Sequence, residues 1–183
     1  MGGVEINAPI SFGMIKIGKN NYYPTTIYPK CNWRIIGTVV FNGKINFLQG
    51  SDVFVAPDAT LSFGTDGAFC GSDFRCYCHH GIRLGNRVHI TWECCLDDSD
   101  GEIRIGDYVW IGNRTTINGS TLIPDNTIIA SNSTLQGDYS VFGENNLLAG
   151  NPAKVKTENV SRIWDEIEEK ELDKKHSYFR TRL

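Results

Sequence analysis

Aliphatic side chains recur at every sixth position over the second half of the chain. The positions in this register are Ile105, Ile111, Ile117, Ile123, Ile129, Leu135, Val141 and Leu147. A lone strand repeats every two residues and an α-helix every 3.6 residues, so neither produces this period. A coil with three short flat sides does, because each six-residue side turns one aliphatic residue inward and about 18 residues complete a turn. The pattern predicts a parallel β-helix.

A second pattern follows each aliphatic position by four residues. Its members are small or polar until the last one: Val109, Thr115, Thr121, Thr127, Ser133 and Tyr139. We expect these side chains at the corners of the coils. Successive coils stack at the usual strand spacing of about 4.8 Å. Each coil therefore buries its aliphatic row only against its neighbours.

The same spacing continues upstream with interruptions. Leu84, Ile90 and Leu96 are six residues apart, but the step from Leu96 to Ile105 is nine. We place the three extra residues in the segment 97–104. Further six-residue steps join Ile27, Trp33, Val39 and Ile45, and join Val55 and Leu61. The expected organisation is an N-terminal extension at 1–11 and a coil stack at 12–152 that is irregular early and regular late.

The period changes after the stack. Val160, Ile163, Trp164 and Ile167 follow the i, i+3, i+4, i+7 spacing of an amphipathic helix. Thr157 or Asn159 is a suitable N-cap. The segment 153–183 is therefore expected to contain an α-helix, which would cover the exposed last coil. The predicted fold class is all-β, a single-stranded parallel β-helix with a C-terminal α-helix.

Composition narrows the classes of function. The chain has 183 residues, of which 40% are hydrophobic, and this suits one domain with an ample core. A net charge of −3 and a pI near 5.8, without a basic stripe, argue against nucleic acid as a partner. No apolar run is long enough for a membrane span, and the N-terminus lacks a signal-peptide pattern. We expect a cytoplasmic protein.

The six cysteines do not indicate a metal site. In a reducing compartment they are expected to be free thiols. The run 76–80, Cys-Tyr-Cys-His-His, has a spacing unlike that of a zinc finger or ribbon, and no second Cys-x-x-Cys supports it. Cys94 falls on a small corner position and is expected to pack there. We therefore expect no metal.

Several motifs together resemble a known family. The segment 103–112 (Ile-Arg-Ile-Gly-Asp-Tyr-Val-Trp-Ile-Gly), the hexads after it and the segment 150–154 (Gly-Asn-Pro-Ala-Lys) resemble the hexapeptide-repeat acyltransferases. Ile90-Thr-Trp92, Asp98-Ser-Asp100 and the late Trp164 resemble, more narrowly, the bacterial polysaccharide O-acetyltransferases. The resemblance is strong from about residue 82 to residue 165 and does not specify the acceptor.

The resemblance implies a left-handed β-helix that works as a homotrimer. It also implies a groove between two subunits that binds acetyl-coenzyme A, from which acetyl is moved to a hydroxyl of a sugar or polysaccharide precursor. An amino group of a nucleotide-linked sugar is a further possible acceptor. The matching donor-site positions are Trp110, Asn113, Ser131, Asn151 and Lys154. Gly137 stands where many relatives carry another lysine.

The chain departs from the family at the catalytic base. The family places a histidine two residues after Asp-Ser-Asp, and here that position is Glu102. In one hypothesis His80, which is 18 residues before Asp98, stacks under that carboxylate and serves as the base, while His79 lies under Asp97. In a second, crowding with Asp98 and Asp100 raises the pKa of Glu102 and makes it the base. In a third, catalysis is lost and the trimer is a binding or assembly module.

Overall fold

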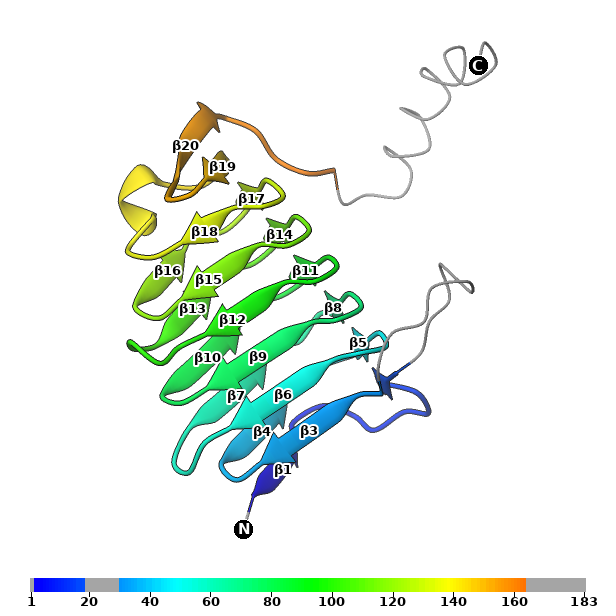
Figure 1. Ribbon diagram of the computed structural model, residues 1–183. Coiled ribbons are helices and arrows are strands. Elements are labelled where there is room, and N and C mark those ends of the chain that lie inside the picture. Colours follow the sequence, from blue (N-terminus) through cyan, green and yellow to red (C-terminus); the bar gives the residue numbers. More distant parts are fainter. Residues whose placement is uncertain (1, 19–29, 164–183) are drawn as a thin grey trace.

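The chain folds into a three-sided solenoid whose sides are three sheets (Figure 1). The structure, a computed structural model, describes residues 2–18 and 30–163. The first sheet contains, in spatial order, β1 (Gly3–Ile6), β4 (Thr38–Phe41), β7 (Thr60–Phe63), β10 (Gly81–Leu84), β13 (Ile103–Ile105) and β16 (Thr121–Ile123). The second contains β2 (Ile15–Ile17), β5 (Ile45–Phe47), β8 (Ala68–Cys70), β11 (His89–Ile90), β14 (Trp110–Ile111), β17 (Ile128–Ile129), β19 (Asn146–Gly150) and β20 (Ala153–Glu158). The third contains β3 (Asn32–Ile35), β6 (Asp52–Val55), β9 (Arg75–Cys78), β12 (Cys95–Asp97), β15 (Thr116–Asn118) and β18 (Thr134–Leu135).

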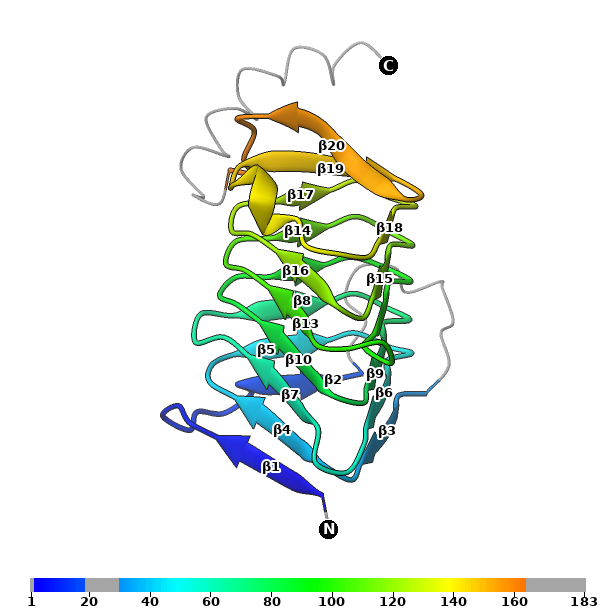
Figure 2. The same cartoon turned by 90° about the vertical axis from the view of Figure 1, so that its left-hand side faces the viewer.

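The solenoid is left-handed, as the resemblance implied. In Figure 1 the chain passes from β9 on the near side to β10 on the left and then to β11 on the right while it rises. Figure 2, seen from the left-hand side, shows the same order with the first sheet in front. All ladders are parallel except that of β19 and β20. This hand is an exception to the right-handed rule for parallel crossover connections.

The predicted aliphatic and corner positions form the core. Ile105, Ile111, Ile117, Ile123, Ile129 and Leu135 are all buried, as are Val109, Thr115, Thr121, Thr127, Ser133 and Tyr139. The corner hydroxyls satisfy backbone carbonyls: Thr127 Oγ1 donates to Pro124 O at 2.8 Å, and Ser133 Oγ donates to Ala130 O at 2.7 Å. Upstream, Val39, Ile45, Val55 and Leu61 are also buried. The six-residue reading of the core is confirmed over this range, and Ile27 lies outside the described residues.

Coil length changes along the stack. Paired positions in the first sheet are 21 residues apart from Leu61 to Ile82 and from Ile82 to Ile103, but 18 apart from Ile103 to Thr121. The difference arises at the corner between the third and first sheets, where the chain leaves β12 at Asp97 and enters β13 at Ile103. The three extra residues predicted between 97 and 104 are therefore present.

The last two positions of the predicted register are wrong. Val141 lies in the 3₁₀ turn η1 (Ser140–Phe142) and is 72% exposed. Leu148, rather than Leu147, pairs with Ile129 and is buried. The turn replaces a flat side and adds one residue, so the inward position moves by one. The interior column is therefore Ile90, Ile111, Ile129 and Leu148.

Both ends of the chain differ from the expected organisation. Residues 3–6, predicted to belong to an extension, form β1 and pair with β4, so the stack begins earlier than residue 12. Residues 153–158 form β20, which folds back antiparallel onto β19, and the chain is not helical up to residue 163. Trp164 and Ile167 lie outside the described residues. The strand β20 covers the edge of the second sheet that a helix was expected to cover. Nothing in the described part of the chain is a helix long and apolar enough to cross a membrane.

Candidate functional site

The candidate base residues lie at the corner between the third and first sheets, here called the catalytic corner. His79 and His80 connect β9 to β10, and the segment 98–102 connects β12 to β13 one coil above. The predicted 18-residue register is wrong here, because Asp97 pairs with Tyr77, 20 residues earlier. His80 is therefore not directly beneath Asp98 in the strand ladder.

Asp98 nevertheless reaches the histidine turn through its carboxylate. Its side chain is buried and accepts hydrogen bonds from three consecutive backbone amides. The amide of His79 donates to Oδ1, while those of His80 and Gly81 donate to Oδ2 at 3.0 and 2.6 Å. The carboxylate thus binds the backbone of the turn and not the imidazole that was expected to be its partner.

The ring of His80 is held by a different group. Its Nε2 lies 3.3 Å from the carbonyl oxygen of Ser99, and the residue is exposed. Because a carbonyl only accepts, Nε2 carries the hydrogen and Nδ1 keeps a lone pair. The ring of His79 instead packs against Phe54, with centroids 5.5 Å apart.

Glu102 lies beside His80 but does not have the properties predicted for a base. Its Oε2 accepts from Arg104 Nε at 3.1 Å and from Arg104 Nη2 at 2.7 Å. These hydrogen bonds and the charge of Arg104 lower the pKa of Glu102 below its usual value, with further lowering by Arg83 and His80. The predicted rise through crowding with Asp98 and Asp100 is wrong, because a guanidinium outweighs the acidic neighbours.

The cysteine and histidine run does not converge. Cys76 and Cys78 point into the core and are buried, whereas His79 and His80 are exposed at the corner. Burial, followed by the charge of Asp98, raises the pKa of Cys78 to about 12. Within residues 2–18 and 30–163, no group of three or more His, Cys, Asp or Glu is placed to hold a metal ion.

The predicted donor-site residues line up along the corner between the second and third sheets, here called the donor corner. Asn113 and Ser131 follow β14 and β17 in successive coils, and Asn113 O accepts from Asn132 N at 2.8 Å. A Cβ on Gly112 would lie only 2.5 Å from Ser131 N, so the glycine permits this close stacking. Asn151 and Lys154 are exposed where β19 turns into β20 above them.

Trp110 projects from the outer face of the second sheet next to the donor corner. Its strand neighbour is His89, and Arg162 lies over the indole with its guanidinium carbon 5.0 Å from the ring centroid. Arg162 Nη1 also lies 2.7 Å from His89 Nδ1. Burial, followed by the charge of Arg162, lowers the pKa of His89 to about 4. His89, expected at the surface, is half-buried between these groups and Phe69.

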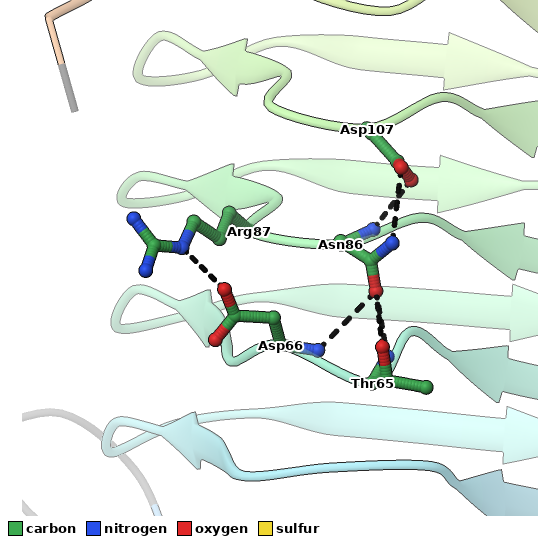
Figure 3. Close-up of polar contacts among 5 residues, drawn as sticks. All are labelled: Thr65, Asp66, Asn86, Arg87 and Asp107. Carbon is green, nitrogen blue, oxygen red and sulfur yellow. Dashed lines mark hydrogen bonds and ion pairs between the residues drawn. The ribbon is translucent and has the colours of Figure 1, made fainter.

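The remaining corner, between the first and second sheets, carries a structural ladder (Figure 3). Asn86 Oδ1 accepts from Thr65 N at 2.8 Å and from Thr65 Oγ1 at 2.9 Å, while Asn86 Nδ2 donates to Asp107 Oδ2 at 3.0 Å. Asp66 accepts from Arg87 Nε at 2.5 Å. These contacts link three successive coils and satisfy their corner amides, so the cluster serves stability.

Two arginines near His80 were missed by the sequence reasoning. Arg83 and Arg104 project outward from β10 and β13 and are paired positions in the ladder. The signal was present as two Ile-Arg-Leu/Ile triplets 21 residues apart, but an 18-residue register does not align them.

Comparison with known proteins agrees on the fold. No protein-family model and no curated protein matches the sequence. A mutant of AntD, an N-acyltransferase from Bacillus cereus solved with dTDP and coenzyme A, has a TM-score of 0.59 at 12% identity, covering 96% of this chain and 91% of that one. The polysialic-acid-specific acetyltransferase NeuO gives 0.59 at 18% identity, covering 97% and 94%. The polysialic acid O-acetyltransferase OatWY gives 0.54 at 16% identity, covering 93% and 98%. The chain therefore has the solenoid fold of these acyltransferases, as its hexad motifs implied.

Proposed function

We propose that the protein is an acyltransferase that moves acetyl from acetyl-coenzyme A to a hydroxyl of a sugar, with His80 as the general base. One observation carries this proposal. The imidazole is exposed at a corner whose backbone is fixed by Asp98, and Ser99 O fixes the tautomer that leaves Nδ1 able to take a proton. Neutral imidazole is suited to this role near pH 7.

The proposed reaction is a direct transfer. The acceptor hydroxyl gives its proton to Nδ1 of His80 while its oxygen attacks the thioester carbonyl. The tetrahedral intermediate collapses with cleavage of the carbon–sulfur bond. The leaving thiolate takes the proton from the imidazolium, which returns His80 to its neutral form.

The donor corner supplies suitable partners for coenzyme A. The pantetheine arm carries amides that need hydrogen-bonding groups, and Asn113, Ser131 and Asn151 present such groups along one edge. Lys154 places a cation above them for a phosphate. AntD was solved with coenzyme A bound, and this supports a donor of that class. The acetyl group itself is the narrower part of the proposal.

The two corners require a second copy of the chain. The catalytic corner and the donor corner lie at opposite edges of the third sheet, which faces the viewer in Figure 1. A base at one edge does not reach a thioester held at the other edge of the same chain. In a cyclic homotrimer the donor corner of one subunit would meet the catalytic corner of the next. We therefore propose the trimer together with the activity, and place it in the cytoplasm, where acetyl-coenzyme A is available.

Two measurements test the proposal. Calorimetry with acetyl-coenzyme A asks whether the donor corner binds. Release of free thiol in the presence of a panel of sugars asks whether transfer follows. His80→Ala should lower kcat by about 100-fold or more, because a positioned base contributes about that factor. His79→Ala, which removes the neighbouring imidazole, and Glu102→Gln should stay within a few-fold of wild type.

The outcomes separate the hypotheses. No binding at millimolar acetyl-coenzyme A would favour a silent binding or assembly module. Full turnover by His80→Ala with loss in Glu102→Gln would transfer the role of base to Glu102 and contradict the proposal.

A further inference from the structure

We propose that Arg83 recognises a carboxylate of the acceptor, so that the substrates are acidic sugars. This inference rests on the proposed function for the identity of the base, but the binding site that it describes is testable without turnover. It assigns a role to a charge next to His80 that the fold does not need.

Arg83 and Arg104 lie one above the other on the outer face of the first sheet. They are paired in the ladder between β10 and β13, and both side chains are exposed. Like charges directly opposite each other in a sheet are unfavourable. A pair of stacked arginines is therefore a cost to stability, which invites an anion as the explanation.

Only one of the two guanidinium groups is already matched. Arg104 uses Nε and Nη2 on the carboxylate of Glu102, which lies over Gly81: a Cβ there would be 3.6 Å from Glu102 Cγ. Among residues 2–18 and 30–163, Arg83 has no hydrogen bond or ion-pair partner, and its printed interaction is a longer-range attraction to Glu102. Arg83 is thus the cation that remains available.

The chemistry of the ligand follows from the number of free cations. One planar guanidinium fork matches one carboxylate through two parallel hydrogen bonds. A diphosphate carries more charge and would require a second free cation, and Arg104 is occupied by Glu102. A single carboxylate is therefore the better match for this corner.

The position of Arg83 also suits an acceptor. It follows His80 by three residues, which is roughly 10 Å along an extended strand. That span is comparable to a sugar ring with its substituents. A sugar whose carboxylate binds Arg83 would extend toward the catalytic corner, where a hydroxyl can meet Nδ1 of His80. Two of the acyltransferases with this fold are specific for polysialic acid, an acidic polymer.

The first experiment measures binding alone. Ligand-observed NMR would compare the methyl glycosides of glucuronic acid and N-acetylneuraminic acid with the same glycosides as methyl esters, using wild type, Arg83→Gln and Arg87→Gln. Arg87 is the matched control, since it is an exposed arginine in an ion pair at a different corner. We expect at least one acid to bind about 10- to 100-fold more tightly than its ester. That preference should disappear in Arg83→Gln and persist in Arg87→Gln.

The contrary outcomes are defined. Equal binding of acid and ester, no binding of either acid at tens of millimolar, or a preference that survives Arg83→Gln would overturn the inference. So would Arg83-dependent binding of UDP-glucose that is tighter than that of the acids, since it would indicate a phosphate site.

The thiol-release assay then separates this inference from the proposed function. With an acidic acceptor, Arg83→Gln should raise KM about 10- to 100-fold with little change in kcat, whereas His80→Ala lowers kcat. Arg83-dependent binding without turnover would contradict the proposed function and leave the carboxylate site standing. Turnover of neutral sugars with no effect of Arg83→Gln would contradict the carboxylate site alone.

Discussion

A buried carboxylate needs several hydrogen-bond donors, and Asp98 finds three of them in one turn. The amides of His79, His80 and Gly81 all donate to it. Without this acceptor, three backbone donors of a tight corner would lose their partner. Asp98 therefore acts on His80 through the backbone, as a positioning residue.

Replacing Asp98 should destabilise the whole domain. Asp98→Ala is expected to lower the free energy of unfolding by about 3 kcal/mol, since buried donors left without partners are costly. Urea denaturation followed by circular dichroism measures the loss. Asp100→Asn, at an exposed position of the same loop, should change it by less than about 0.5 kcal/mol. Equal effects of the two substitutions would contradict the role given to Asp98.

His89 predicts a dependence of stability on pH. Its pKa of about 4 in the folded protein lies below the value of about 6.5 expected in the unfolded chain. Between these values the unfolded state binds the extra proton, so stability falls as the pH is lowered from about 6.5 to about 4, by up to about 3 kcal/mol. Above pH 6.5 the effect vanishes.

Melting temperatures of wild type, His89→Gln and His79→Gln from pH 4 to pH 7.5 test this dependence. The His89→Gln curve should be flatter below pH 6.5, whereas the curve of the exposed His79→Gln should run parallel to wild type. Parallel curves for all three proteins would show that His89 titrates normally.

Strands and coils show where sequence reasoning succeeds. From Ile105 to Leu135 each flat side has six residues, and periodicity alone identifies the inward residue of each side. It fails where a corner changes length. The long corner between β12 and β13 and the turn η1 shift the register, because corner residues carry no periodic signal.

The same limitation explains the outcome at the candidate site. His80 and Asp98 were brought together by sequence reasoning and are close in the structure, but the contact is to the backbone. Nothing in the spacing distinguishes a side-chain partner from three amides. Arg83 and Arg104 were missed because their pairing depends on the 21-residue coil.

The corrected register at the C-terminal end is testable. Leu148→Ala removes a buried side chain from the interior column and should cost about 3 kcal/mol. Leu147→Ala, on the outer face, should cost less than about 1 kcal/mol. Denaturant titration of both variants gives the comparison. A larger loss for Leu147→Ala would restore the original six-residue phase and contradict the pairing of Leu148 with Ile129.

The whole molecule is a prism with different chemistry at each long edge. One edge carries His80, a second carries Asn113 and Ser131, and the third carries the ladder around Asn86. The first two are separated by the full width of the third sheet. The proposed activity therefore depends on how copies of the chain associate, because a head-to-tail ring joins unlike edges of adjacent subunits.

Association should be visible directly. Sedimentation equilibrium is expected to give the mass of three chains. A monomer at micromolar concentration would leave the two edges apart and would contradict the assembly that the proposed activity requires.

Mixed trimers test the central claim most directly. One variant, His80→Ala, lacks the base, and another, Asn113→Ala with Lys154→Ala, lacks the donor edge; each alone should be nearly inactive in thiol release. Refolding or co-expressing them together should restore activity at about a quarter of the sites, because a random ring then unites an intact base from one chain with an intact donor edge from its neighbour. Mixtures that remain as inactive as the separate variants would contradict a site shared between two copies of the chain.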